Sequence, residues 1–182
     1  DAEQIPAEEG DCIDMPASLV TTLELGAINE ANNSIEVWVT TPDSLAGFQF
    51  EVTGFTMVNV YGGIAEEYGY TLANSENIAL GFTMTMDPII PPGTHLLHYI
   101  EYDPFSLVDG EDGCLTEIIL ADPDAEQIPA EEGDCIVMPN APNASTIIVD
   151  SGGSGDYLTI QDGIGNASIY DTVLVMDGTY FE

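Results

Sequence analysis

Residues Ser34–Thr41 read SIEVWVTT, and the alternation of apolar side chains in this stretch decides the fold class. Ile35, Val37 and Val39 fall on one side of an extended chain, and the residues between them fall on the other. A period of two residues is typical of a β-strand with one face in a core and one face in solvent. The stretch therefore predicts a half-buried strand.

The same alternation recurs through the middle of the chain. It runs through GFQFEVT at 47–53, NIALGFTM at 77–84, HLLHYIEY at 95–102 and CLTEIILAD at 114–122. Turn-forming segments such as NEANNS and TPDS separate these stretches, and none of the stretches keeps a helical period. We therefore expect an all-β fold, an antiparallel β-sandwich of eight or nine strands and of jelly-roll type.

The charge balance of the chain is extreme. It has 33 Asp and Glu residues and neither Lys nor Arg, so its formal net charge is −33, yet 45% of its residues are hydrophobic. The apolar content indicates a folded core, in contrast to a disordered acidic tail. Such a surface repels itself and needs salt, divalent cations or a basic partner. The absence of Lys and Arg excludes nucleic-acid binding through these residues and excludes a P-loop. The negative charge also excludes attraction to anionic membranes. No apolar run has membrane-spanning length.

A duplication organises the chain. Asp1–Ile13 reads DAEQIPAEEGDCI, and Asp124–Ile136 repeats the same thirteen residues. The match includes the Met-Pro pair just beyond each copy and leaves one difference, Asp14 against Val137. Near-identity across a domain-sized offset indicates tandem duplication.

Two interpretations of residues 1–16 are open. In the first, they are the tail strand of a preceding repeat whose own sheet lies outside this chain. In the second, they are a donor strand that completes a sheet in a neighbouring chain. The remaining organisation follows from composition: a sandwich at 17–139, a linker at 140–146 and a second unit at 147–182.

The three cysteines suit an oxidising compartment. Cys114 and Cys135 bracket the last two predicted strands, so we expect a disulfide between them. Cys12 is the duplicate of Cys135, and its own partner would lie before residue 1. It is therefore either separated from that partner or bonded to another chain. The spacings do not fit a zinc site.

Several segments together resemble a known family. They are AGFQFEVTG at 46–54, GFTMT at 81–85, IPPGT at 90–94, and Cys114 with the later GDC at 133–135. This combination resembles the cohesin-like sandwich modules of large secreted bacterial surface proteins, over about 17–139. The resemblance implies a module for scaffolding, adhesion or carbohydrate association, without catalytic residues.

The C-terminal residues 147–182 resemble the opening of a pectate-lyase-like right-handed parallel β-helix. The resemblance implies a strand, a short helix after Thr159–Gln161, and a strand ending at Gly178–Tyr180. One or two coils of a β-helix cannot bury their own faces. Strand material without partners at both ends of the chain suggests a polymer whose subunits complete one another.

The sequence predicts no enzymatic activity. The β-helix enzymes that the C-terminal residues resemble rely on Arg or Lys, which this chain lacks. Among 33 acidic residues, proximity of two carboxylates says little about glycoside hydrolysis. His95 and His98 lie three positions apart in a predicted strand, so we expect them on opposite faces and without a shared metal.

Calcium is the ligand that the acidic residues favour, because Ca²⁺ prefers hard oxygen ligands. The candidate ligands are Asp109, Glu111, Asp112, Asp122, Asp124, Glu131 and Asp134. The alternative is that these residues form solvated loops that counter-ions screen diffusely.

We expect a structural subunit or repeat segment of an extracellular surface or filament protein. It would associate with identical chains or adjacent repeats, in one version by strand exchange. The alternative is a carbohydrate- or protein-binding module of a large adhesin or secreted enzyme. The candidates for a sugar platform are Trp38, Tyr61, Tyr68 and Tyr70, and core packing is the alternative for each of them.

Overall fold

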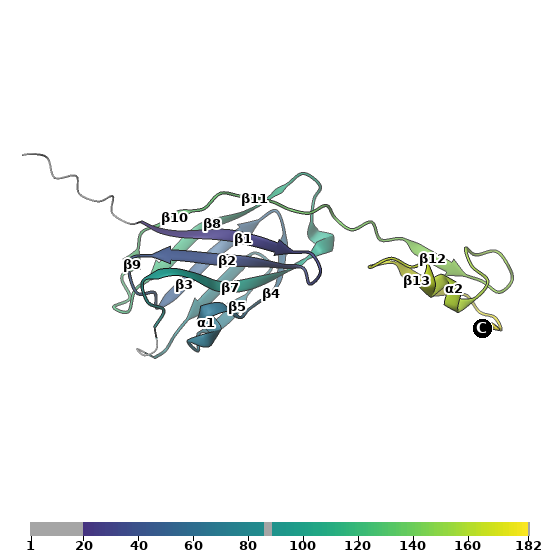
Figure 1. Ribbon diagram of the computed structural model, residues 1–182, viewed down its shortest axis with the longest axis horizontal. Helices are drawn as coiled ribbons and strands as arrows, with labels where there is room; N and C mark the ends of the chain where they lie inside the picture. The colour runs from purple at the N-terminus through teal and green to yellow at the C-terminus, as the bar shows by residue number, and fades with distance from the viewer. Residues whose placement is uncertain (1–19, 86–88, 182) are drawn as a thin grey trace, which may run out of the picture.

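The structure is a computed structural model that describes residues 20–85 and 89–181. Two β-sheets pack face to face over residues 21–137, and a smaller unit follows toward the C-terminus (Figure 1). The predicted all-β sandwich is therefore confirmed. The predicted tail strand, residues 1–16, lies outside the described residues.

The first sheet has the strand order β10-β1-β2-β7-β4. Its members are β1 (Thr21–Asn29), β2 (Ser34–Thr41), β4 (Thr56–Tyr61), β7 (Gly93–Asp103) and β10 (Ala130–Glu132). Neighbouring strands are antiparallel except β1 and β10, which are parallel. A short hairpin would make neighbouring strands antiparallel. The chain instead reaches β10 from β9 of the other sheet, so β10 can run parallel to β1.

The second sheet has the strand order β11-β8-β3-β6-β5, and β9 also pairs with β8. Its members are β3 (Gly47–Thr53), β5 (Thr71–Asn74), β6 (Ile78–Phe82), β8 (Asp112–Ala121), β9 (Gln127–Ile128) and β11 (Ile136–Val137). A short helix, α1 (Gly63–Glu67), and a 3₁₀ turn, η1 (Pro104–Ser106), join strands of the sandwich. Every pair in this sheet is antiparallel.

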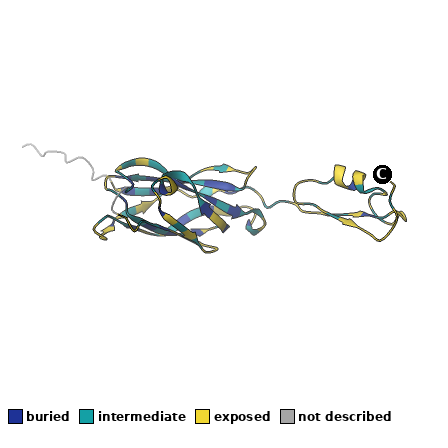
Figure 2. Cartoon of the chain, turned by 90° about the horizontal axis from the view of Figure 1, so that it is seen from below, coloured by how far each residue is buried: buried dark blue, intermediate teal, exposed yellow. Residues whose placement is uncertain are grey.

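The core lies between the two sheets and is built from the alternating apolar residues (Figure 2). Ile35, Val37 and Val39 of β2 are fully buried, as their spacing predicted. Phe48 and Phe50 of β3 supply large rings from the opposite sheet. Complete burial of such a side chain contributes roughly 1.5–3 kcal/mol. The two inner faces therefore hold the sandwich together without any contribution from Lys or Arg.

His98 of β7 is a fully buried titratable side chain within this core. Its ring stacks on Phe48 and Phe50, with centroid distances of 5.3 and 5.6 Å. Nδ1 lies 3.1 Å from the carbonyl oxygen of Tyr99, and Nε2 has no hydrogen-bond partner among the described residues. Burial lowers the pKa of His98 to about 4, against the opposing effect of the carbonyl. The imidazole is therefore neutral at physiological pH.

Residues 127–137, which we call the closing strand, join the two sheets along one side. The closing strand pairs with β8 through β9, crosses to β1 through β10, and returns to β8 through β11. The N–H of Gly133 donates to the Leu23 carbonyl at 2.8 Å. A Cβ at Gly133 would lie 2.5 Å from the Cβ of Glu24, so this crossing needs glycine.

The C-terminal unit has the expected order of strand, short helix and strand. β12 (Thr146–Val149) pairs in parallel with β13 (Thr172–Val175), and α2 (Ile160–Gly165) lies between them in the chain. A Cβ at Gly163 would lie 2.4 Å from Val149, so α2 packs closely on β12. Exposed residues cover most of this unit (Figure 2). Its continuation as a β-helix stays a prediction.

The last strand ends earlier than expected. β13 stops at Val175, whereas the resemblance implied a strand ending at Gly178–Tyr180. The Tyr180 hydroxyl hydrogen-bonds instead to the carbonyl oxygens of Val149 and Met176, at 3.0 and 2.7 Å. These contacts turn the chain back over β12 and β13.

Replacing His98 by Leu should remove one acid-dependent loss of stability. The side chain binds a proton near pH 6.5 in the unfolded chain but only near pH 4 in the folded chain. The free energy of unfolding therefore falls as the pH is lowered through this window, by roughly 3 kcal/mol. Urea unfolding at about pH 7 and about pH 4 measures the loss in both proteins. Because the carboxylates are common to both proteins, equal losses in wild type and variant would contradict this role for His98.

Candidate functional site

The outer face of the first sheet carries a group of aromatic side chains, Trp38, Tyr61 and Tyr99, which we call the aromatic face. Tyr61 lies opposite Tyr99, with ring centroids 5.5 Å apart and an angle of 24° between the rings. Tyr99 also lies opposite Glu36, whose Oε2 accepts a hydrogen bond from Trp38 Nε1 at 2.9 Å. All three aromatic residues are half-buried. Their positions are therefore held by neighbouring strands.

A groove of about 640 Å³ opens beside Tyr61 and Tyr99 and extends to the turn between β1 and β2. Its lining residues are Ala27, Ile28, Asn29, Glu30, Asn32, Ser34, Glu36, Tyr61 and Tyr99. The walls thus combine aromatic rings with amide, hydroxyl and carboxylate groups. The lining is more polar than that of a usual small-molecule pocket, and it offers hydrogen-bonding groups beside the two rings.

The four aromatic residues predicted as a sugar platform separate into two groups. Trp38 and Tyr61 lie on the aromatic face. Tyr68 packs against the core, and Tyr70 is buried with its hydroxyl donating to the Leu45 carbonyl. Burial raises the pKa of Tyr70. Sequence reasoning missed Tyr99, although its alternation with buried His98 and Ile100 would have placed it on the outer face.

The outer face of the second sheet carries exposed apolar side chains. Gln49 of β3 lies between Leu80 of β6 and Ile119 of β8, which are 36% and 48% exposed. Met84, just beyond β6, is 88% exposed. Exposed apolar groups that gather on one face mark candidate contact surfaces for proteins. The sandwich therefore presents an aromatic outer face and an apolar one.

The predicted pair Cys114 and Cys135 is bonded in the structure. The disulfide ties β8 to the closing strand between β10 and β11. It therefore reinforces the hydrogen bonds that already hold the closing strand between the sheets. Cys12 lies outside the described residues.

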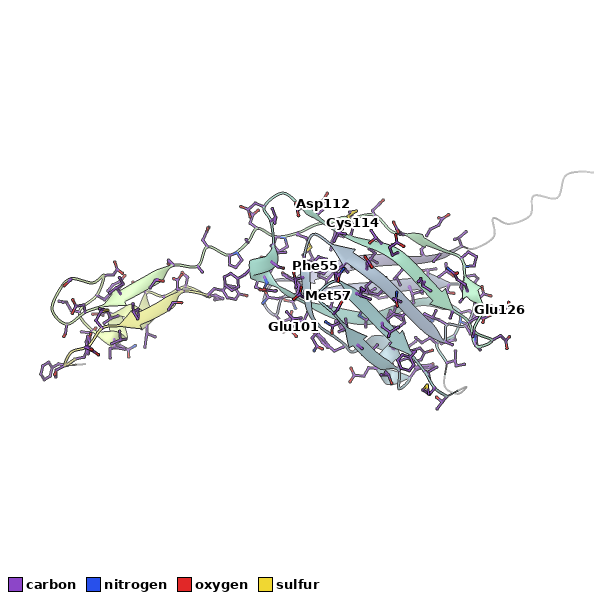
Figure 3. The ribbon with its side chains drawn as sticks, turned by 180° about the vertical axis from the view of Figure 1, so that it is seen from behind. Phe55, Met57, Glu101, Asp112, Cys114 and Glu126 are labelled. Atoms are coloured by element: carbon purple, nitrogen blue, oxygen red, sulfur yellow. A yellow bond between two sulfur atoms is a disulfide. The ribbon has the colours of Figure 1, made fainter. Side chains whose placement is uncertain are left out.

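The predicted calcium ligands are dispersed over the sandwich, near both ends of β8 and in the closing strand. Asp112 begins β8, and Glu126 follows the turn at its other end, far across the sandwich (Figure 3). Asp109 accepts a hydrogen bond from the Ala141 N–H at 3.1 Å, while Asp122 accepts from Asp124 and Glu126 at 2.9 and 2.8 Å. Asp122 therefore bonds the backbone of its own turn, and Asp109 bonds the backbone of the segment that follows β11.

The other candidate ligands, Glu111, Asp112, Glu131 and Asp134, are exposed. Within residues 20–85 and 89–181, no group of three or more His, Cys, Asp or Glu side chains lies close enough together to hold a metal ion. Calcium binding stays a prediction.

The expectation that His95 and His98 point to opposite faces is wrong. His95 lies opposite Val39 and His98 opposite Val37, and both valines face the core. A β-bulge in β7 places one extra residue between the two paired positions, which inverts the alternation. His95 Nε2 lies 3.0 Å from the Pro91 carbonyl oxygen, so the two rings occupy separate environments.

No protein-family model and no curated protein matches the chain. Solved structures of cohesins are similar to it. A non-cellulosomal cohesin from the hyperthermophilic archaeon Archaeoglobus fulgidus is 16% identical, covers 65% of this chain and 92% of its own, and has a TM-score of 0.46.

Two further structures are similar. A complex of CaDoc0917 with CaCohA2 is matched at 15% identity, over 65% of this chain and 100% of that chain, with a TM-score of 0.44. The second type II cohesin module of the ScaA scaffoldin from Acetivibrio cellulolyticus is 13% identical over 66% of this chain and 96% of its own, with a TM-score of 0.39. None of the helices in the described ranges has the length and hydrophobicity needed to cross a bilayer.

Replacing both Cys114 and Cys135 by Ser should lower the free energy of unfolding by roughly 3 kcal/mol, because the disulfide closes a loop of 21 residues. Urea unfolding without reductant measures the loss. Cys12→Ser serves as the matched control and should leave stability unchanged. A double variant as stable as the control would show that the closing strand is held by its hydrogen bonds and packing alone.

Proposed function

We propose that this chain is a non-catalytic structural segment of an extracellular repeat protein, and that it acts by assembling with other protein chains. The observation that carries the proposal is the closing strand. Residues 127–137 complete both sheets of the sandwich, and the sequence of residues 124–136 recurs as residues 1–13. A second copy of the closing sequence can occupy the same place in another sandwich, which favours joining one sandwich to another.

The side chains support a role without catalysis. The chain has no Lys or Arg to stabilise developing negative charge. Of its two histidines, His98 is enclosed by aromatic rings and His95 is bonded to a backbone carbonyl. The carboxylates of Asp109 and Asp122 accept hydrogen bonds from backbone N–H groups. The described groups thus serve the fold.

The disulfide and the charge favour an extracellular or cell-surface location. Disulfides persist in oxidising compartments. A surface of 33 carboxylates without basic side chains also needs the ions of its surroundings to moderate self-repulsion. Calcium is the ion we propose for this role. Residues 147–182 would extend the segment as the start of a parallel β-helix.

Light scattering on the native chain tests the proposal. We expect particles much larger than the 19.4 kDa chain in the presence of calcium, and smaller ones after chelation. Assemblies that persist in chelator would support the structural role without calcium. Monomers under both conditions, at any concentration tried, would contradict self-assembly.

A second candidate function, binding of a neutral glycan, is favoured by the aromatic face. Trp38, Tyr61 and Tyr99 lie together beside a groove that also contains amide and hydroxyl groups. Aromatic rings supply a large contact area and lose little side-chain entropy on binding, which suits contact with the apolar faces of sugars. The glycan would be neutral, because the acidic surface repels anionic polymers.

Replacing Tyr99 by Ala should weaken glycan binding about tenfold, which corresponds to roughly 1.4 kcal/mol. Titration with soluble neutral polysaccharides, followed by calorimetry, measures the dissociation constant. Phe181→Ala is the control, because it removes an exposed ring of the C-terminal unit that does not line the groove. If both variants bind like the wild type, or if the wild type binds none of the glycans, the aromatic face has another role.

A further inference from the structure

The closing strand occupies a defined slot along one side of the sandwich. Strand β8 forms one wall through its pairs with β9 and β11, and strand β1 forms the other through its pair with β10. The slot joins the two sheets at their open edges. Its occupant must therefore satisfy both walls at once.

The slot contacts a specific set of side chains. Ile128 and Met138 are both 6% exposed, and Ala130 and Ile136 pack against the core. Gly133 passes too close to β1 for any side chain. Cys135 bonds to Cys114. Apolar contacts, a glycine crossing and a disulfide thus define the occupant.

Residues 1–16 carry the same residue at each of these positions. The counterparts, in order, are Ile5, Ala7, Gly10, Cys12, Ile13 and Met15. The position that differs is Asp14, and its counterpart Val137 is 80% exposed. Val137 lies opposite Asp112 of β8, so Asp14 would set a second carboxylate beside Asp112 at this solvent-exposed position. The apolar, glycine and cysteine contacts with the slot are the same for the two copies.

We propose that residues 1–16 of one chain bind the slot of a second copy of this chain, in place of its own closing strand, and that Cys12 then bonds covalently to Cys114 of that copy. This inference rests on the self-assembly proposed above and names its contact. Each chain donates at its N-terminal end and accepts in its sandwich. Such a head-to-tail contact builds a filament wherever the rotation from one copy to the next does not close into a ring.

The geometry of the slot favours a second chain over the donor's own sandwich. Glu9 would take the place of Glu132 beside Leu23, parallel to β1. Of the residues that connect Glu9 to Leu23 within one chain, residues 10–13 would themselves be held in the slot. Ile13 would also lie beside Gly113, as Ile136 does, which leaves only residues 14–20 to return to the start of β1. A neighbouring chain faces no such limit.

The covalent step needs no external oxidant. The Cys12 thiol loses its proton, and its thiolate attacks the Cys114 sulfur of the Cys114–Cys135 disulfide. The Cys12–Cys114 bond forms as the Cys114–Cys135 bond breaks, and Cys135 leaves as a thiolate that takes up a proton. One disulfide replaces another, so the electrons balance.

The energetics make the exchange depend on concentration. The incoming strand makes the same apolar, glycine and cysteine contacts as the resident strand. These contacts therefore contribute little to the difference in free energy between the slot with its own strand and the slot with the incoming strand. The resident strand is tethered to its own slot, which acts as a high effective concentration. Exchange therefore needs concentrated or aligned chains, or a weakened resident strand.

The test uses the full chain with Cys135→Ser, which frees Cys114 and leaves Cys12 as its possible partner. Oxidised glutathione accepts the two electrons and two protons that a Cys12–Cys114 bond releases. We expect a ladder of linked chains on non-reducing gels. Digestion at Asp and Glu, followed by mass spectrometry, should identify the Cys12–Cys114 bond; trypsin is unsuitable because the chain has no Lys or Arg.

Two matched variants in the Cys135→Ser background separate slot binding from random oxidation. Gly10→Val should reduce the ladder at least tenfold, because the side chain would collide with β1 as it would at Gly133. Asp14→Val should not reduce it, because the resident strand has Val at this exposed position opposite Asp112. A ladder that Gly10→Val does not reduce, a Cys12–Cys114 bond found only in monomers, or no ladder at all would overturn the inference.

A second measurement uses the wild-type chain and does not depend on the folding of any variant. A synthetic peptide of residues 1–16 should form a disulfide with Cys114, one peptide per chain, and its Gly10→Val version should react at least tenfold less. Equal reaction of the two peptides would overturn the inference. If both tests fail while light scattering still shows large particles, the chain assembles through another surface and the proposed function stands.

Discussion

The contact between the closing strand and strands β1 and β8 is the constraint on which the sandwich depends. Without residues 127–137, each sheet would end in an unpaired edge and the core between them would open on one side. Hydrogen bonds to both walls, the crossing at Gly133 and the disulfide to Cys114 all act on this one segment. The sequence of this segment recurs in residues 1–13, so the contact that closes the sandwich is also the one on which the proposed assembly rests.

The second constraint is a folded chain with no Lys or Arg. Its carboxylates find partners in backbone N–H groups. Asp150 accepts from Gly152 and Ser154, and these bonds hold its pKa below the ordinary value. Asp171 bonds Ser168 and Ser145, with the same effect on its pKa. Turns thus take over the role that ion pairs have in other proteins, while the apolar core supplies the cohesion.

The candidate sites differ in how far the sequence could predict them. The disulfide partners were predictable, because the two cysteines bracket consecutive strands. Trp38 was assigned correctly to an outer face by the alternation of SIEVWVTT, whereas Tyr70 lies outside the stretches that alternate clearly. Tyr70 is buried because its hydroxyl reaches the Leu45 carbonyl across the end of the sandwich. The bulge in β7 that places His95 and His98 on one face depends on pairing with β2, and strand spacing alone does not reveal it.

The sequence by itself determined the all-β class, the strands of the sandwich, the charge and the duplicated segment, because alternation and identity are properties of the linear chain. Only the tertiary structure decided what the duplicated segment does. Its strands are too short to be recognised by alternation, and their pairing with both sheets depends on β1 and β8, which lie far from one another in the chain. The packing of β1 and β8 decides which residues of the closing strand are buried in the slot and which face solvent. For that reason only the folded molecule shows that Val137, the position at which the two copies differ, is exposed.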